Sequence, residues 1–323
     1  MRVYDGIEQF QPPTRGVVLT VGNFDGVHLG HRRLVAAARE RARGSNAPVV
    51  AVTLEPHPLV ILAPERAPAC LTTCAEKAAL LETCGVDALI VLRSTRELLD
   101  QTAEQFLLDL VERCRPCAIV EGPTFNFGRG RQGSVDTLRR WAGRLKFELT
   151  LVAELHSAGL TDNPAINSSV IRTALRDGRI EEANVMLGRP HRVTGTVAAG
   201  KQRGAGLGFP TANLTAIPQL LPRQAVYAGV AQLADDSLHL AAINVGPQPT
   251  FSQEQLCVEA HLLDYAGHLL GQRLGLHLLA RLRDQVRFNG TDQLAAQLRR
   301  DAERARTFAS DLTRLRAAPR LPL

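Results

Sequence analysis

Two histidines near the start of the chain have a spacing that suits phosphate chemistry. His28 and His31 lie three residues apart in the stretch VGNFDGVHLGH, directly after the apolar run VVLTVG. This spacing places both imidazoles on neighbouring positions of one face of a helix that begins here. A turn from strand to helix exposes backbone N–H groups and a positive partial charge, which favour anions. We therefore expect a polyphosphate pocket at this helix start.

Glycines surround the two histidines. Gly22, Gly26 and Gly30 allow a bulky phosphate to approach the backbone closely. A zinc helix would instead require HExxH spacing and a third ligand. The alternative is that both histidines are ordinary helix-surface residues. The glycine-flanked Asp25 and the preceding strand favour phosphate binding.

A second glycine-rich segment follows in GKQRGAGLGFPTAN, residues 200–213. Backbone amides of such a loop can surround a nucleotide. The segment lacks the GxxxxGK[ST] pattern and is therefore not a Walker loop. A plain glycine-rich turn is the alternative interpretation.

The first half of the chain alternates strand and helix patterns. The expected strands are 17–22, 48–54, 87–92, 117–122 and 146–152, and the expected helices are 29–43, 74–84, 103–114 and 135–144. Short apolar runs separated by helices indicate a parallel sheet covered on both faces. Ligands bind such sheets at the carboxyl ends of the strands, which is where the histidines lie.

The pattern changes after about residue 189. Five apolar segments separated by turns precede a helix expected at about 293–315, which indicates an antiparallel sheet or small barrel closed by a terminal helix. We place the boundary between two domains at residues 187 and 188, giving domains 1–187 and 188–323.

Composition narrows the class of protein. The 323 residues carry a formal charge of +6, which suits either nucleic acid or anionic small molecules as partners. Aromatic residues make up 4%, too few for a base-stacking platform. No apolar run reaches membrane length and no secretory signal is present, so we expect a soluble, cytoplasmic protein. The lone CxxC pair, Cys114 and Cys117, is better explained by ordinary thiols than by metal or redox chemistry.

Four segments of the first half match a known family in order and spacing. VGNFDGVHLGH, TLEPHP (53–58), FNFGRGRQG (125–133) and NSSVIR (167–172) resemble the bacterial bifunctional riboflavin kinase/FMN adenylyltransferases, or FAD synthetases. The resemblance extends over roughly residues 15 to 310. It implies a Rossmann-like nucleotidyltransferase domain with a parallel sheet, followed by a small antiparallel β-barrel domain with a C-terminal helix.

The resemblance implies roles for individual residues of the first domain, which would transfer the adenylyl group of ATP to FMN. His28 and His31 would stabilise the leaving pyrophosphate, because the FMN phosphate is already ionised and needs no strong base. Arg172, with Ser168 and Ser169 at a helix start, would clamp the β- and γ-phosphates. Asn126 would shape the flavin-phosphate side. His57 would either contact substrate or support its loop.

In the second domain, PTAN (210–213) resembles the riboflavin kinase signature, in which Thr211 and Asn213 adjoin Mg²⁺ and the ATP phosphates. The ribityl hydroxyl of riboflavin is not ionised, and Glu259 matches the family's catalytic base. An ordinary solvent-facing strand glutamate is the alternative. The residues expected to bind substrates are Gly22, Phe24, Asp25, Gly26, Gly30, His57, Asn126, Ser168, Ser169, Gly200, Gly204, Gly208, Pro210, Thr211 and Asn213.

Three departures from the family pattern leave a second interpretation open. Asn167 stands where the family has a serine, Thr124 where it has Asp or Asn, and Ala225 where it has a glycine. If that glycine needs positive φ, Ala225 is strained by about 1–2 kcal/mol. The chain could then be a riboflavin kinase with a weakened adenylyltransferase. We expect ATP, riboflavin and FMN as substrates, Mg²⁺ as cofactor, no nucleic-acid or membrane partner, and at most a weak homo-oligomer.

Overall fold

The computed structural model describes residues 1–160, 163–199, 208–247 and 256–323. These form two compact units, one of residues 1–68 and 74–166 and the other of residues 69–73 and 167–323. The division of the chain into domains at residues 187 and 188 stays a prediction. Within the described residues, no helix has both the length and the apolar character needed to cross a membrane.

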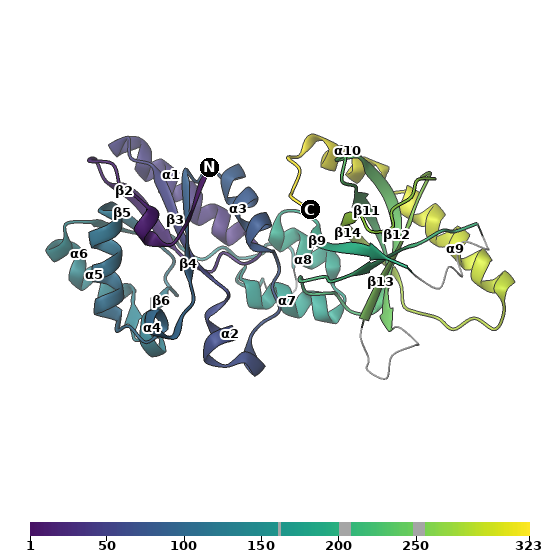
Figure 1. Cartoon of the computed structure of the whole chain (residues 1–323), viewed down its shortest axis with the longest axis horizontal. Coiled ribbons are helices and arrows are strands. Elements are labelled where there is room, and N and C mark those ends of the chain that lie inside the picture. The colour runs from purple at the N-terminus through teal and green to yellow at the C-terminus, as the bar shows by residue number, and fades with distance from the viewer. Residues whose placement is uncertain (161–162, 200–207, 248–255) are drawn as a thin grey trace. The chain divides into compact units, whose positions relative to one another are not determined.

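The first unit contains a six-stranded, fully parallel sheet in the order β1-β4-β3-β2-β5-β8 (Figure 1). Its strands are β1 (Arg2–Asp5), β2 (Val17–Val21), β3 (Val49–Glu55), β4 (Ala88–Arg93), β5 (Pro116–Glu121) and β8 (Glu148–Leu151). The five expected strands are all present. The edge strand β1 was not predicted, because its residues are mostly exposed and carry no apolar run.

Helices cover both faces of this sheet. They are α1 (Leu29–Ser45), α2 (Pro58–Leu62), α3 (Cys74–Thr83), α4 (Arg96–Leu99), α5 (Ala103–Cys114) and α6 (Val135–Leu145), and a small hairpin adds β6 (Asn126–Phe127) and β7 (Gly133–Ser134). Figure 1 shows α5 and α6 on one side of the sheet and α1 and α3 on the other. Leu107 and Leu138 pack against Leu19 in one apolar cluster. Every residue of β2 is buried, as a central parallel strand requires.

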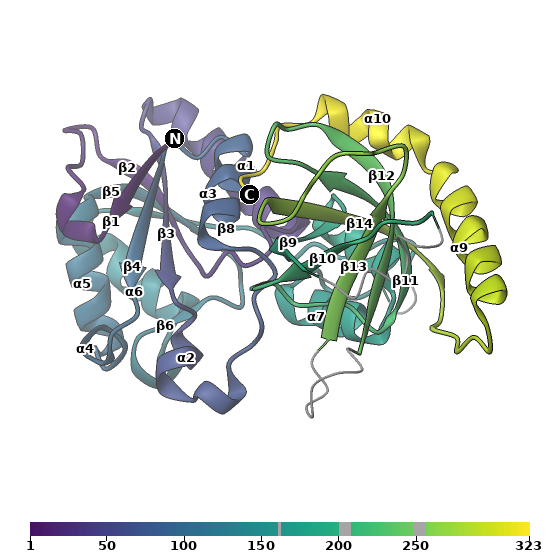
Figure 2. The same cartoon turned by 45° about the vertical axis from the view of Figure 1, so that its right-hand side comes forward.

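The second unit is built around a closed antiparallel barrel in the order β10-β13-β12-β11-β14-β9 (Figure 2). Its strands are β9 (His191–Ala198), β10 (Ala212–Thr215), β11 (Ala225–Gln232), β12 (Leu238–Pro247), β13 (Leu256–Leu262) and β14 (Arg273–Arg283), and its helices are α7 (Ser168–Asp177), α8 (Ile180–Leu187), α9 (Thr291–Arg306) and α10 (Ala309–Ala317). The expected class, a parallel α/β domain followed by a small antiparallel barrel, is confirmed.

Two local expectations for the second unit are corrected. We expected one terminal helix, but the chain forms two, because α9 ends at Arg306 and α10 begins at Ala309. Apolar residues of both helices, among them Ala305 and Leu312, pack on the outside of the barrel. Ala225 lies in β11 and is not among the residues with positive φ, so the strain expected there is absent.

Candidate active sites

The histidine loop of the first unit lies where the strand order of the sheet reverses. Strand β2 ends at Val21 and α1 begins at Leu29, and β2 is flanked by β3 on one side and β5 on the other. The chain passes from β2 to β3 and β4 in one direction, and from β5 to β8 in the other. A crevice outside the carboxyl ends of the strands forms at such a switch point. Residues 22–28 therefore occupy the position at which a doubly wound sheet binds ligands.

The two imidazoles are stacked. Their ring centroids lie 3.6 Å apart, with an angle of 21° between the planes. His28 is the N-cap of α1, and its Nδ1 accepts a hydrogen bond from the His31 N–H at 3.3 Å. The expectation that both lie on one helical face is thus corrected, since His28 precedes the helix. Because Nδ1 is an acceptor, neutral His28 carries its proton on Nε2, which can donate to an anion.

His28 is buried and His31 is partly buried. His28 is 5% exposed, and the buried Nδ1 of His31 has no hydrogen-bond partner among the described residues. Burial, the adjacent His28 ring and the Lys77 ammonium lower the pKa of His31 well below its ordinary value. His31 is therefore a neutral imidazole at neutral pH, suited to donating or accepting a hydrogen bond.

The backbone of the histidine loop is strained. Phe24 and Val27 have positive φ angles of 46° and 39°, although neither is glycine. Such angles are uncommon for any L-residue and are outliers for a β-branched one. Phe24 is buried, with its ring 5.2 Å from that of His31. Strained backbone of this kind gathers at functional sites, where the surrounding structure maintains it.

Two glycines of the loop, Gly26 and Gly30, serve different needs. Gly26 adopts a φ of 83°, a conformation that L side chains rarely reach. At Gly30, an added Cβ would lie 3.1 Å from the His28 ring and 3.1 Å from the Ile166 carbonyl oxygen. Gly30 therefore lets chain segments pack closely around the imidazoles, which is a structural role beyond the phosphate approach that we expected. Asp25 is 7% exposed at the same turn.

A buried carboxyl group at the switch point was missed by sequence reasoning. Glu121 ends β5, is 2% exposed, and accepts a hydrogen bond of 2.6 Å from the Val21 N–H. Burial raises the pKa of Glu121 well above its ordinary value, and the Val21 N–H bond acts in the opposite direction. Its only sequence signal is an acidic residue directly after the apolar run CAIV. Glu121 ties β5 to the end of β2, where the histidine loop begins.

Two other predicted residues of the first unit have clear local contacts. Asn126 lies exposed in β6, and its Nδ2 donates to the Thr124 carbonyl oxygen at 2.6 Å. The rings of Phe125 and Phe127 on either side of it stack at 5.4 Å. His57 is the N-cap of α2, with Nδ1 accepting from the Leu59 N–H. His57 thus supports its own loop, and its contact with substrate stays a prediction.

The NSSVIR segment begins α7 in the second unit. Asn167 is the N-cap, and its Oδ1 accepts hydrogen bonds from the backbone N–H groups of Ser169 and Val170, each at 3.0 Å. Asparagine is among the best N-caps, so this departure from the family pattern preserves the helix start. Arg172 is buried, with Nε donating to the Ala69 carbonyl oxygen at 2.8 Å. The grouping of Ser168, Ser169 and Arg172 with the imidazoles stays a prediction.

Polar residues of three neighbouring barrel strands are aligned in register. The Cα of Glu259 in β13 pairs with Asn213 in β10 and with Asn244 in β12. Val258 and Ala260 are fully buried, so Glu259 points to the opposite face, as strand alternation predicted. Gln285 extends the row, because its Nε2 donates to Asn244 Oδ1 at 3.0 Å. The carboxylate is thus flanked by amides rather than isolated in solvent.

The signature PTAN reaches the same face of the barrel. Gly200 and Gly204 lie outside the described residues, whereas Gly208 has a φ of 83°. His261, two residues beyond Glu259 on β13, donates from Nδ1 to the Pro210 carbonyl oxygen at 2.9 Å. Thr211 directly precedes β10, which contains Asn213. Sequence reasoning missed His261, although its spacing of two from Glu259 is the signal for a shared strand face.

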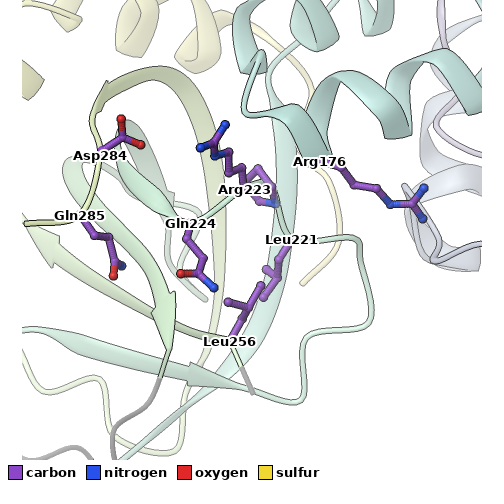
Figure 3. A pocket seen from close by; sticks show the side chains of 8 residues that line it. Arg176, Leu221, Arg223, Gln224, Leu256, Asp284 and Gln285 are labelled. Atoms are coloured by element: carbon purple, nitrogen blue, oxygen red, sulfur yellow. The ribbon is translucent and has the colours of Figure 1, made fainter. Parts of the chain in front are cut away.

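A cavity of about 580 Å³ lies beside this row in the second unit. Figure 3 shows its lining side chains, which come from α7, the segment before β11, the start of β13 and the end of β14. They are Arg176, Leu221, Pro222, Arg223, Gln224, Leu256, Asp284 and Gln285. Gln285 joins the cavity to the row through Asn244. The volume is within the range of small-molecule sites.

The cysteines show no paired arrangement. None of the six, all of which lie in described segments, forms a disulfide bond, and Cys114 is buried while Cys117 is half-buried. Across residues 1–160, 163–199, 208–247 and 256–323, no group of three or more His, Cys, Asp or Glu side chains is placed to hold a metal ion. The expectation of ordinary thiols for the CxxC pair stays a prediction.

The first unit has a histidine loop suited to phosphate binding at the switch point of a doubly wound sheet. The second unit has a barrel on which the Glu259 carboxylate lies between two amide residues. This combination defines a two-unit transferase that acts on nucleotide phosphates. The family model described as FAD synthetase matches residues 10–163, and that described as riboflavin kinase matches residues 187–309.

Curated relatives extend the match over both units. A bifunctional riboflavin kinase/FMN adenylyltransferase of Escherichia coli K12 is 37% identical over 95% of this chain and 98% of its own length. A protein of the same description from Listeria monocytogenes is 32% identical over 91% and 93%. The chain therefore belongs to the bifunctional riboflavin kinase/FMN adenylyltransferase family, which confirms the resemblance. Because both modules are present, the interpretation with two activities is supported over that with a single active module.

A solved structure shares the fold over nearly the whole chain. This protein, from Streptococcus pneumoniae, is described as a macrolide-efflux protein; it is 27% identical, with a TM-score of 0.83 over 94% of this chain and 98% of that one. We take from it the likeness of fold alone.

Proposed function

We propose that the two activities of the family are divided between the two units. The second unit transfers the γ-phosphoryl group of ATP to riboflavin and yields FMN. The first unit then transfers the adenylyl group of a second ATP to FMN, which yields FAD and releases pyrophosphate. One contrast between the sites carries the proposal. The barrel presents Glu259 between two amides, whereas the sheet presents a stacked imidazole pair.

In adenylyl transfer, the FMN phosphate attacks the α-phosphorus of ATP. This nucleophile is already ionised at neutral pH, so the site has to align the reactants and stabilise charge on the leaving pyrophosphate. His28 Nδ1 accepts from the His31 N–H, so a neutral His28 ring carries its proton on Nε2. Neutral His31 lies directly against it. Arg172, Ser168 and Ser169 would supply further contacts to the β- and γ-phosphates, and Asn126 would contact the flavin phosphate.

In the kinase reaction, the nucleophile is a neutral hydroxyl group that has to lose a proton. The Glu259 carboxylate would accept that proton as the hydroxyl attacks the γ-phosphorus. Its register with Asn213 and Asn244 fixes the position of the strand backbone on both sides. The cavity joined to this row by Gln285 would receive the flavin ring system. Its lining combines Leu221 and Leu256 with polar groups, as small-molecule sites generally do.

The residues of the barrel site suit Mg²⁺. Thr211 and Asn213 offer uncharged oxygen donors, and Asn213 adjoins the Glu259 carboxylate across the β10–β13 pair. Mg²⁺ prefers a few protein oxygens, with waters and nucleotide phosphates completing its shell. When bound, the ion would neutralise charge on the transferred phosphoryl group. Cytoplasmic localisation, a weak homo-oligomer and the lack of a nucleic-acid partner stay predictions from the sequence.

The test is a time course with the purified full chain. Riboflavin, ATP and Mg²⁺ are added, and the flavins are separated by chromatography. FMN should rise first and FAD should follow. In a second reaction, FMN is supplied in place of riboflavin, and FAD should form with one pyrophosphate released per FAD. If FMN accumulated and supplied FMN gave no FAD, the assignment of adenylyl transfer to the first unit would be wrong.

A further inference from the structure

A buried lysine lies beside the imidazole pair. Lys77 in α3 is 3% exposed, and its Nζ donates to Glu55 Oε2 at 3.0 Å and to Thr53 Oγ1 at 3.3 Å. Thr53 Oγ1 in turn donates to the carbonyl oxygen of Asn23 at 3.1 Å. Lys77 is therefore connected through one hydroxyl group to the loop that carries His28. The ammonium is close enough to His31 to lower the pKa of that imidazole.

The identity of this residue is unusual for the chain. Lysine accounts for three of the 38 basic residues, at positions 77, 146 and 201, and arginine for the others. Arginine is the usual choice for a buried ion pair, because its planar group forms paired hydrogen bonds with a carboxylate. Lysine is instead a compact point charge, the form in which phosphate-binding lysines act. A structural pair with Glu55 alone gives no reason for lysine at this position.

The adenylyl-transfer site also has a charge requirement that the neutral His31 ring does not meet. Negative charge gathers on the pyrophosphate as it leaves, and preorganised positive charge in a dry site stabilises it strongly. His31 is neutral at neutral pH, because burial and its neighbours lower its pKa. Of the groups that lower the pKa of His31, Lys77 is the one with a permanent ammonium charge.

We propose that Lys77 supplies the fixed positive charge of the adenylyl-transfer site and stabilises the leaving pyrophosphate, with Glu55 holding the ammonium in place. Lys77 acts through its field on the phosphates and on the His31 ring, so it is a positioning residue. The inference rests on the proposed adenylyl transfer in the first unit. It assigns a fixed charge to Lys77 in addition to the phosphate contacts proposed for Arg172, and leaves hydrogen-bond donation to the imidazoles.

The surroundings of Lys77 set up a discriminating comparison. The carboxylate of Glu55 is 38% exposed and opposes the lysine charge. The pKa of the nearby Cys74 thiol is raised mainly by burial and next by Glu55, whereas Lys77 lowers it. Both charges therefore act in this region. If Lys77 stabilises bound phosphates, removing the Lys77 charge should weaken anion binding, and removing the Glu55 charge should strengthen it. If the pair is merely structural, both removals should act in the same direction.

The experiment uses the full chain with three substitutions, Lys77→Met, Glu55→Gln and Lys146→Met. Lys146 is exposed at the end of α6, so its loss is a matched control for net charge. The readouts are the Kd of pyrophosphate by calorimetry and the kcat and KM of FAD formation from supplied FMN. Riboflavin phosphorylation by the same sample reports an intact second unit, and urea unfolding followed by circular dichroism reports the folding of the whole chain.

Lys77→Met should lower the kcat of FAD formation and weaken pyrophosphate binding, each about tenfold or more, with a smaller change in the KM of FMN. Glu55→Gln should lower the pyrophosphate Kd, and Lys146→Met should match the unaltered protein. The inference is overturned if Lys77→Met matches Lys146→Met, or if Glu55→Gln leaves pyrophosphate binding unchanged or weakens it. Should Lys77→Met not fold, Glu55→Gln decides by the direction of its change.

Failure of the wider proposal would look different. If the unaltered protein formed no FAD from supplied FMN, adenylyl transfer itself would be the wrong assignment. If it formed FAD at rates indifferent to Lys77, the role of the lysine alone would be wrong.

Discussion

Asn213 and Glu259 are direct cross-strand partners, with their Cα atoms in register between β10 and β13. The two residues lie 46 positions apart in the sequence numbering, from 213 to 259. Cross-strand partners have Cβ atoms about 4.5–5.5 Å apart and share one face of the sheet. A proposed Mg²⁺ ligand and a proposed general base are thereby placed as neighbours. Their distance is set by backbone pairing rather than by flexible side chains.

The first prediction concerns the base. Glu259→Gln keeps the size and hydrogen-bonding capacity of the side chain but removes the proton acceptor. FMN formation from riboflavin should fall about 100-fold or more, because general bases contribute 10²–10⁴ in rate. FAD formation from supplied FMN should be unchanged. The exposed Glu303 in α9 provides a matched control, and Glu303→Gln should retain both rates. Equal loss of both reactions in Glu259→Gln would contradict the separation of the two sites.

The second prediction separates the helix cap from the chemistry at His28. Because His28 Nδ1 caps α1, His28→Ala should lose about 1 kcal/mol of unfolding free energy as well as FAD formation. His28→Asn keeps a strong capping acceptor and should unfold at the same urea concentration as the unaltered protein. Its FAD formation should nevertheless be lost, while riboflavin phosphorylation persists. FAD formation restored by Asn would show that His28 serves the cap alone.

The third prediction is a pH dependence of stability. Burial, followed by Arg192, Arg189 and Arg320, lowers the pKa of His277 to about 3. The unfolded chain takes up a proton below about pH 6.5, whereas the native imidazole stays neutral until about pH 3. The unfolded state therefore binds more protons in this window, and stability is lost as pH falls through it.

In His277→Asn, the free energy of unfolding should fall less steeply as the pH is lowered. The slope should decrease by at most about 1.4 kcal/mol per pH unit, which is the value for one proton. The measurement is the free energy of unfolding in urea at a series of pH values between 3 and 7. His268→Asn, at an exposed position, is the control. Parallel pH curves for His277→Asn and the unaltered protein would refute a neutral buried imidazole.

The fourth prediction compares two glycines of the FNFGRG turn. Gly128 and Gly130 have φ angles of 71° and 61°, so alanine is strained at both by about 1–2 kcal/mol. An added Cβ at Gly128 would also lie 2.6 Å from the backbone of Ala103 at the start of α5, whereas at Gly130 nothing lies within 4 Å. Gly128→Ala should therefore be destabilised by at least about 1 kcal/mol more in urea unfolding. Equal losses would show that backbone strain alone governs this turn.

Much of the architecture was predictable because its signals are local. Helix α5 has the bounds expected from its sequence, since Thr102 and Gln105 form a capping box and apolar residues repeat with helical period. The buried strands β2, β3 and β5 are continuous apolar runs. The family was likewise evident from short motifs, and it is confirmed. By contrast, β1 exists through its pairing with β4, and its four residues, three of them exposed, show no local pattern that predicts a strand.

The sequence by itself determined which chemical groups this protein has: the histidine pair, the PTAN signature, and a glutamate facing away from a buried strand face. Only the tertiary structure decided what surrounds them. It stacked His28 on His31 as a helix cap, brought Lys77 and Glu121 into the same unit's interior, and aligned Asn213, Glu259 and Asn244. The physical reason is that residue type and spacing act through neighbours along the chain, whereas burial, charge and register depend on segments that meet only after folding.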